Sequence, residues 1–82
     1  MTGDSFRFCR LDRAGHVLTI TIDRPDVHNC IDQETNLELQ HAFKRFRDDD
    51  EAFVAIYTGA GDKAFCAGWD LNDAAALRTA FQ

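Results

Sequence analysis

One stretch of the chain, residues 64–71 with the sequence AFCAGWDL, has the residue types and spacing of an anion-binding turn between a strand and a helix. An apolar run, 53–58, and a glycine turn precede it, and an alanine-rich segment follows. The pattern predicts a helix that begins at Trp69 or Asp70, where unpaired backbone N–H groups and the helix dipole favour a negatively charged oxygen. Gly68 permits a positive φ or a close approach of a ligand to the backbone. We therefore interpret the Trp69 amide as a donor to an oxygen that gains negative charge.

Two strands are expected before this stretch. Residues 6–11 alternate roughly between apolar and polar side chains, and 17–22 alternate strictly, with the leucine and both isoleucines on one face. Residues 12–16 between them are predicted to form a turn, so the two strands pair as an antiparallel hairpin. The second strand ends before Pro25, because proline has no N–H group for the sheet ladder.

The rest of the chain predicts a helix, a strand and a second helix. Asp32 is a favourable N-cap for a helix over 32–47, whose apolar residues recur at the i, i+3, i+4 and i+7 spacing of one helical face. Residues 53–57 are almost entirely apolar, which indicates a strand covered on both faces. Strand, helix and strand in this order imply a right-handed parallel crossover, and residues 71–81 are expected to form a final helix. The predicted order is ββαβα, one unit of an α/β fold with an open sheet edge.

Two motifs resemble the N-terminal part of the enoyl-CoA hydratase/isomerase family, also called the crotonase family. One is IDRPDVHN at residues 22–29, and the other is AFCAGWDL, which follows the sequence YTGAG at 57–61. The motifs occur in the family's order and at about the family's distance, and the similarity runs from about Val17 to Leu71. The resemblance implies an incomplete crotonase-like spiral fold built from ββα units, with residues 1–82 as the N-terminal part of the domain.

The resemblance also implies roles for individual residues. In the family, the position after the Ala-Gly pair, here Trp69, supplies one of two backbone N–H groups that bind the thioester oxygen. The backbone at Ala67 corresponds to the position that meets the adenine of coenzyme A. The loop after the Arg-Pro pair resembles the coenzyme A contact loop. The positions expected at the substrate are Arg24, Asp26, Val27, His28, Cys66, Ala67, Gly68 and Asp70.

Three of the polar residues have alternative interpretations. Arg24 can offset phosphate charge, or it can be a cation on the surface. Asn29 is expected to tie its loop together by side-chain hydrogen bonds rather than to touch substrate. The carboxylate of Asp70 suits the start of the final helix, so it is not expected to act as an acid or base in the reaction.

Chemistry in the family passes through a thioester enolate, most often in the hydration of a 2-enoyl-CoA or in double-bond isomerisation. The resemblance therefore implies an acyl-CoA thioester as ligand, with coenzyme A as part of the substrate and no tightly bound cofactor. The second oxyanion N–H and the catalytic carboxylates of the family are expected beyond Gln82, so the chain alone is expected to lack appreciable hydratase turnover. Because the family assembles as trimers or paired trimers, a homo-oligomer is expected.

Composition restricts the other classes of function. A formal net charge of -5 leaves no basic surface for nucleic acid. No apolar run approaches the roughly 20 residues that span a bilayer, and the first residues do not resemble a signal peptide, so we expect a cytoplasmic protein with no membrane contact. The three cysteines are widely spaced, which favours reduced thiols over a disulfide framework or a zinc site. The acidic run 48–51 lacks calcium-loop spacing and is expected to be a solvated connector.

Three further hypotheses follow from the residues. Residues 59–64, GAGDKA, satisfy a loose dinucleotide-binding pattern, but no helix follows directly and the expected acidic residue about 20 positions on falls at or past Gln82. Cys66 near a helix start could be a nucleophile, but no histidine is placed beside it, so a small packed side chain is favoured. The alternative function is a non-catalytic module that binds coenzyme A or pairs with another chain through its open sheet edge.

Overall fold

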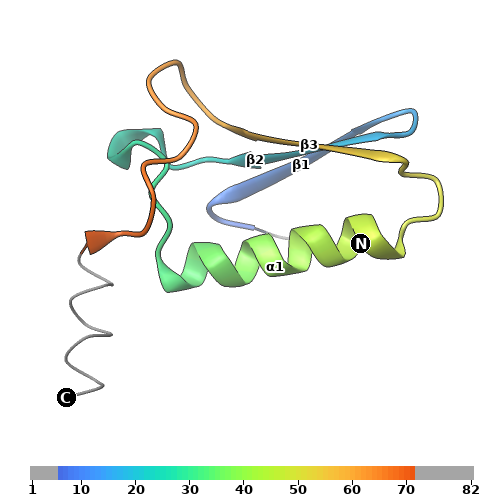
Figure 1. Cartoon of the computed structure of the whole chain (residues 1–82), viewed down its shortest axis with the longest axis horizontal. Coiled ribbons are helices and arrows are strands. Elements are labelled where there is room, and N and C mark those ends of the chain that lie inside the picture. Colours follow the sequence, from blue (N-terminus) through green and yellow to red (C-terminus); the bar gives the residue numbers. More distant parts are fainter. Residues whose placement is uncertain (1–5, 72–82) are drawn as a thin grey trace.

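The computed structural model of the chain describes residues 6–71, in which a three-stranded sheet lies against one long helix (Figure 1). The elements are β1 (Cys9–Ala14), β2 (Val17–Ile22), the short 3-10 helix η1 (Pro25–Val27), α1 (Gln33–Asp48) and β3 (Val54–Gly59). The strand order is β1-β2-β3, with β1 antiparallel and β3 parallel to β2. The predicted ββαβ order and the parallel crossover are therefore confirmed. The predicted final helix lies outside the described residues except for Leu71, which is helical.

The hairpin is tighter than the sequence predicts. Ala14 is the register partner of Val17, so the turn consists of Gly15 and His16 alone. The prediction of a five-residue turn is wrong because Gly15 has a φ of 59°, which permits a two-residue turn and lets β1 extend to Ala14. The predicted first strand accordingly begins too early, since β1 starts at Cys9.

The core lies between β2 and α1. Ile20 and Ile22 are fully buried, and Leu18 on the same face is nearly so. From the helix, Leu39 and Ala42 belong to the same buried cluster. The helix begins where the sequence predicts, because the Asp32 side chain accepts a hydrogen bond from the Thr35 amide at 2.8 Å. The predicted buried face of β2 is thus confirmed, although Thr21 on its other face is buried as well, and the apolar face of the helix is confirmed at Leu39 and Ala42.

Strand β3 is not covered on both faces within the described residues. Val54 is 52% exposed, Ile56 48% and Tyr57 36%. Tyr57 is the register partner of Ile20 and shares its face, whereas Val54 and Ile56 lie on the opposite face. The prediction of full coverage is wrong here because α1 contacts chiefly β1 and β2, and no strand in 6–71 pairs with the outer edge of β3.

Three further observations concern the described residues as a whole. None of their helices is long and apolar enough to cross a membrane. The thiols of Cys9, Cys30 and Cys66 are free. Residues 6–71 contain no group of three or more His, Cys, Asp or Glu side chains that could hold a metal ion.

Candidate functional site

The two sequence motifs meet where β2 and β3 end. Because these strands are parallel, the loop after β2, residues 23–32, and the segment after β3, residues 60–70, leave the sheet at the same edge (Figure 1). Three backbone hydrogen bonds join them: the Ala67 amide donates to the His28 carbonyl at 3.0 Å, the Ile31 amide to the Gly68 carbonyl at 2.7 Å, and the Asp70 amide to the Ile31 carbonyl at 2.7 Å. We call residues 23–32 and 60–70 together the loop junction. It brings together all of the predicted site residues.

Trp69 forms a parallel bridge with Ile31. In such a bridge the N–H and C=O of Ile31 bond to the residues on either side of Trp69, so the N–H and C=O of Trp69 itself point away from Ile31. No hydrogen bond within residues 6–71 uses the Trp69 amide. Trp69 as a whole residue is 37% exposed. Trp69 is extended rather than helical, and Leu71 is the first helical residue, which agrees with the predicted helix from residue 71 and with a start close to Asp70. The bridge to Ile31 holds the backbone extended up to the helical Leu71.

Gly68 is required for its backbone angle. Its φ is 95°, a region that residues with a Cβ rarely adopt, while an added Cβ would meet no atom within 4 Å. Its amide lies 3.4 Å from the sulfur of Cys66. Cys66 is half-buried and packs against the core, in agreement with the predicted small packed side chain. The strand-to-helix turn therefore takes its shape from Gly68 just before the Trp69 amide.

Arg24 is held inside the loop junction and is not a surface cation. Only 14% of its side chain is exposed, and its Nη2 lies 3.5 Å from Asp32 Oδ2 and 3.6 Å from Asp70 Oδ2. Its Nη1 donates to the Cys30 carbonyl at 2.8 Å, and the guanidinium lies over the Phe8 ring at 5.1 Å. Two carboxylates thus share one cation at the base of both loops.

These charges perturb the acids beside them. Burial alone would raise the pKa of Asp32, but hydrogen bonding from Thr35 and the charge of Arg24 outweigh it and hold this pKa below its ordinary value. Burial raises the pKa of the Cys30 thiol, the Asp70 carboxylate adds to the increase, and Arg24 opposes it. The Cys30 sulfur lies 3.7 Å from Asp70 Oδ2. The thiol is therefore held protonated beside a carboxylate.

The coenzyme A contact loop predicted from the sequence lies on the solvent side of the loop junction. Asp26 and Val27 belong to η1 and are exposed, and His28 follows in a left-handed conformation with a φ of 56°. The His28 carbonyl accepts the Ala67 amide, so the predicted adenine contact and the predicted contact loop are direct neighbours.

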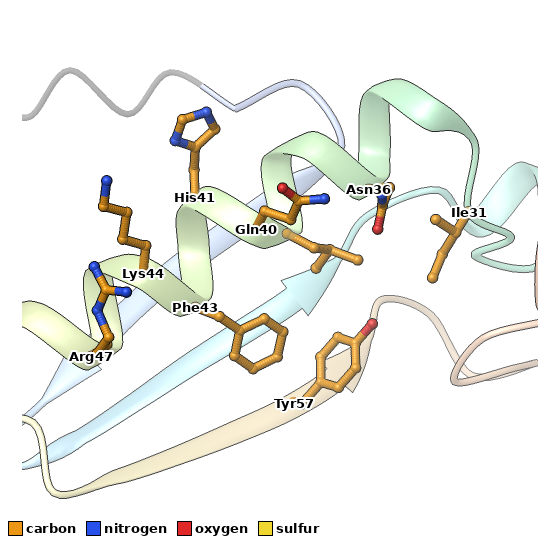
Figure 2. Close-up of a pocket in the computed structure, with 9 residues that line it drawn as sticks. Ile31, Asn36, Gln40, His41, Phe43, Lys44, Arg47 and Tyr57 are labelled. Carbon is orange, nitrogen blue, oxygen red and sulfur yellow. The ribbon is translucent and has the colours of Figure 1, made fainter.

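A groove of about 740 Å³ runs between α1 and β3, and sequence reasoning did not identify it (Figure 2). Phe43 and Tyr57 face each other across it with ring centroids 5.3 Å apart, edge to face, and Tyr57 meets Phe65 in the same way at 5.0 Å. Ile31, the bridge partner of Trp69, lies at one end and Arg47 at the other (Figure 2). The residues that line it are Ile31, Asn36, Leu39, Gln40, His41, Phe43, Lys44, Arg47 and Tyr57.

Comparison with known structures first identifies the fold. An enoyl-CoA hydratase from Bacillus anthracis superposes with a TM-score of 0.81 at 32% sequence identity, covering 90% of this chain and 31% of that chain. A carnitinyl-CoA hydratase from Mycobacterium avium gives a TM-score of 0.79 at 38% identity, covering 84% of this chain and 26% of that chain. The described unit is therefore an incomplete unit of the crotonase fold.

Sequence comparison then identifies the family. The family model described as Enoyl-CoA hydratase/isomerase matches residues 12–82, and the chain belongs to this family. A carnitinyl-CoA dehydratase from Escherichia coli K12 is 54% identical over 65 residues, covering 79% of this chain and 24% of the relative. The corresponding protein of Salmonella arizonae is 54% identical over 66 residues, covering 80% and 25%. The chain thus spans about a quarter of the length of the curated relatives that it matches.

Proposed function

We propose that this chain supplies the N-terminal, acyl-CoA-binding part of an enoyl-CoA hydratase/isomerase-type enzyme, in which the Trp69 amide donates a hydrogen bond to the thioester oxygen. The observation that supports this role is the direction of that amide. It points away from Ile31, is unused within residues 6–71, and is held by bonds to the residues on either side. A donor fixed in this way needs no rearrangement when a ligand oxygen arrives.

The chemistry that such a donor assists is the formation of an enolate. When a proton leaves the carbon next to a thioester carbonyl, or a nucleophile adds to the β-carbon of an enoyl thioester, negative charge develops on the carbonyl oxygen. One fixed N–H aimed at that oxygen typically lowers the barrier by about 2.7–4 kcal/mol. Gly68 and the two hydrogen bonds of Ile31 determine where this N–H points.

Proton transfer requires groups other than those in the loop junction. Asp70, the carboxylate nearest in sequence to the Trp69 amide, is paired with Arg24 at 3.6 Å and has only 17% of its side chain exposed. We therefore propose that the acid and base come from polypeptide other than residues 6–71, and that the 82-residue chain alone shows no appreciable hydratase turnover. A crotonyl-CoA hydration assay on this chain tests that statement.

For the substrate we propose an acyl-CoA of the kind named in the relatives, carnitinyl-CoA, with coenzyme A as part of the substrate and no further cofactor. The 54% identity to carnitinyl-CoA dehydratases supports this choice. The proposed contacts to the coenzyme A moiety are made by Asp26, Val27, His28 and the backbone at Ala67, which lie next to one another on the solvent side of the loop junction.

Removal of the Trp69 N–H by an amide-to-ester replacement tests the oxyanion role directly. Cys66 provides the ligation point: residues 1–65 are prepared as a thioester and joined to synthetic 66–82 that carries the hydroxy-acid analogue of Trp69. The quantity to measure is the carbonyl increment, the ratio of the affinity for crotonyl-CoA to the affinity for the carbonyl-free thioether S-butyl-CoA. We expect the ester to lower this increment by about fivefold, the effect of one lost hydrogen bond.

The matched control is an ester at Gly68, whose amide faces the Cys66 sulfur rather than the solvent. It should leave the carbonyl increment unchanged. A wild-type chain that binds both ligands equally, or an ester at position 69 without effect, would contradict the proposed function.

A second candidate function is assembly with further polypeptide, and the exposed face of β3 favours it. We propose that the outer edge of β3 and the α1–β3 groove are covered by more polypeptide of the same fold, in an assembly that forms a homo-oligomer of three or six copies. The relatives are about four times as long as the matched region, and apolar side chains on both faces of β3 are exposed. Size-exclusion chromatography with light scattering should show association that Tyr57→Asp, in the groove, weakens and that Leu37→Asp, on α1 but outside the groove lining, does not.

A further inference from the structure

The side chain of Asn29 is buried in the loop junction and makes three hydrogen bonds there. It is 1% exposed. Its Oδ1 accepts the Arg24 amide at 2.8 Å, and its Nδ2 donates to the Ala60 carbonyl at 2.9 Å and to the Ala64 carbonyl at 2.8 Å. One side chain therefore joins the start of the loop after β2 to two points of the segment after β3.

The position suits asparagine in both backbone and side chain. Its φ is 56°, in the left-handed region where asparagine is enriched among non-glycine residues. Aspartate has the same size but no N–H to give to the two carbonyls, and glutamine is longer by one methylene. At this position only asparagine supplies two donors and one acceptor at the required length.

Gly59, at the end of β3, also contacts the segment 60–65 that Asn29 holds. A Cβ at this position would approach the Phe65 carbonyl oxygen to 2.1 Å and Asn29 Nδ2 to 2.7 Å. The segment 60–65 therefore passes directly over the end of β3 with no free space, and the Asn29 side chain holds it there. Beyond Phe65 the chain continues to Ala67 and Gly68, which the backbone of His28 and Ile31 holds.

From these contacts we infer that Asn29 is a positioning residue for the Trp69 amide. Its neighbours in sequence hold residues 67–70 by backbone bonds, while its own side chain holds residues 60 and 64. It therefore holds the segment that leads into Gly68 and into the two hydrogen bonds of Ile31, the groups that determine where the Trp69 N–H points. This inference rests on the proposed function, in which that N–H meets the thioester oxygen.

The inference predicts a specific loss. Without the two Nδ2 donors, residues 60–65 lose their attachment to the loop after β2, while the backbone bonds at 67, 68 and 70 are still available. The coenzyme A contacts proposed for Asp26, Val27 and His28 do not use the Asn29 side chain. We therefore expect the carbonyl increment to fall and the affinity for the carbonyl-free ligand to change much less.

The experiment measures affinities of the 82-residue chain, labelled with ¹⁵N, for crotonyl-CoA and S-butyl-CoA. In Asn29→Asp we expect the carbonyl increment to fall about fivefold, the affinity for S-butyl-CoA to change less than about twofold, and the crotonyl-CoA-induced shift of the Trp69 amide resonance to shrink. Asn29→Gly is the second variant, because glycine adopts a φ of 56° without strain and removes the same donors. It should reproduce the loss even if the aspartate at this position prevents folding.

Ala42→Gly is the control for stability. Ala42 is fully buried in α1, away from the loop junction, and the glycine costs about 1 kcal/mol in a helix interior. It should leave the carbonyl increment unchanged. If Ala42→Gly lowers the increment as much as the Asn29 variants do, or if the Asn29 variants keep it, the positioning role is wrong. A wild-type chain without any carbonyl increment would instead overturn the proposed function, and this inference with it.

Discussion

The two sides of β3 differ in how completely their groups are paired. At its carboxyl end, in the loop junction, Asn29 makes three hydrogen bonds while 1% exposed, and Arg24 is matched by two carboxylates. Along its length, Ile56 is 48% exposed and the rings of Phe43 and Tyr57 line an open groove. The polar groups of the loop junction are paired, and we call this the complete side of β3. The apolar side chains along the strand and in the groove are exposed, and we call this the open side.

The difference follows from the range of the two interactions. A hydrogen bond is satisfied by one partner at about 3 Å, so two neighbouring loops can complete a polar network by themselves. Apolar burial grows with the area removed from water, and a small unit has too little chain to cover both faces of a sheet. The loop junction can therefore form within residues 6–71, whereas the face of β3 requires more polypeptide to be buried.

The strongest way to disturb the complete side is to add one methyl group at Gly59. The Cβ of Gly59→Ala would stand 2.1 Å from the Phe65 carbonyl oxygen, which is backbone and cannot rotate away. We expect the free energy of unfolding to fall by about 3 kcal/mol, at the upper end for overpacking. Urea denaturation measures this value.

Gly15→Ala is the matched control, because an added Cβ there meets nothing within 4 Å and the only cost is its φ of 59°. That variant should lose about 1 kcal/mol. Equal losses in the two variants would show that the segment 60–65 is not packed against the end of β3.

A smaller effect is expected at Asp32, which caps α1 and also pairs with Arg24. Asp32→Ala should cost about 1 kcal/mol at neutral pH through loss of the cap. The pKa of Asp32 is depressed in the folded chain, so its charge stabilises the fold above the unfolded pKa of about 4, and this contribution is lost as the pH falls through the folded pKa. Urea midpoints of wild type and variant should therefore converge below about pH 4.

Asp32→Asn separates the two roles, because asparagine caps a helix as well as aspartate does but carries no charge for Arg24. At neutral pH this variant should lie between wild type and Asp32→Ala. A difference between wild type and Asp32→Ala that is independent of pH would show that the charge of Asp32 contributes nothing.

Much of β2, the start of α1 and the loop junction could be predicted from the sequence. The strict alternation of β2 identifies its buried face, Asp32 marks the helix start, and asparagine at position 29 predicts hydrogen bonds within its loop; each is a local pattern. The two motifs also predicted that residues near 24–29 and 64–71 belong to one family site. The sequence indicates the Trp69 amide as a donor, but the bridge to Ile31 that orients this amide could not be predicted, because Ile31 is distant in sequence.

The predictions that are wrong or undecided concern contacts between segments that are distant in sequence. A local sequence pattern does not contain these contacts. The apolar character of β3 indicated coverage on both faces, but exposure depends on which segments are present to cover Ile56 and Tyr57. Phe43 is one of the apolar residues at the i, i+3, i+4 and i+7 spacing that indicates the buried helical face, yet it lines the groove at 40% exposure. The sequence does not decide whether Arg24 offsets phosphate charge or lies on the surface, because its pairing with Asp70 forms only where the two loops meet.

The smallest expected change in the free energy of unfolding is on the open side of β3. It is measured by making the same isoleucine-to-valine substitution at two positions. Ile20 and Ile56 lie on adjacent strands and are 0% and 48% exposed. In dilute chain, Ile20→Val should lower the free energy of unfolding by about 1 kcal/mol, whereas Ile56→Val should change it by less than about 0.5 kcal/mol.

The comparison becomes sharper as the chain concentration is raised. If the face of β3 that carries Ile56 associates, Ile56 becomes buried and the cost of Ile56→Val should rise toward that of Ile20→Val, because burial of the same methylene then contributes in both places. The cost at Ile20, which is buried in every state of the folded chain, should stay constant and acts as the internal control. A cost at Ile56 that equals that at Ile20 in a monomeric sample would mean that β3 is already covered, and the contrast between the two sides of the strand would be wrong.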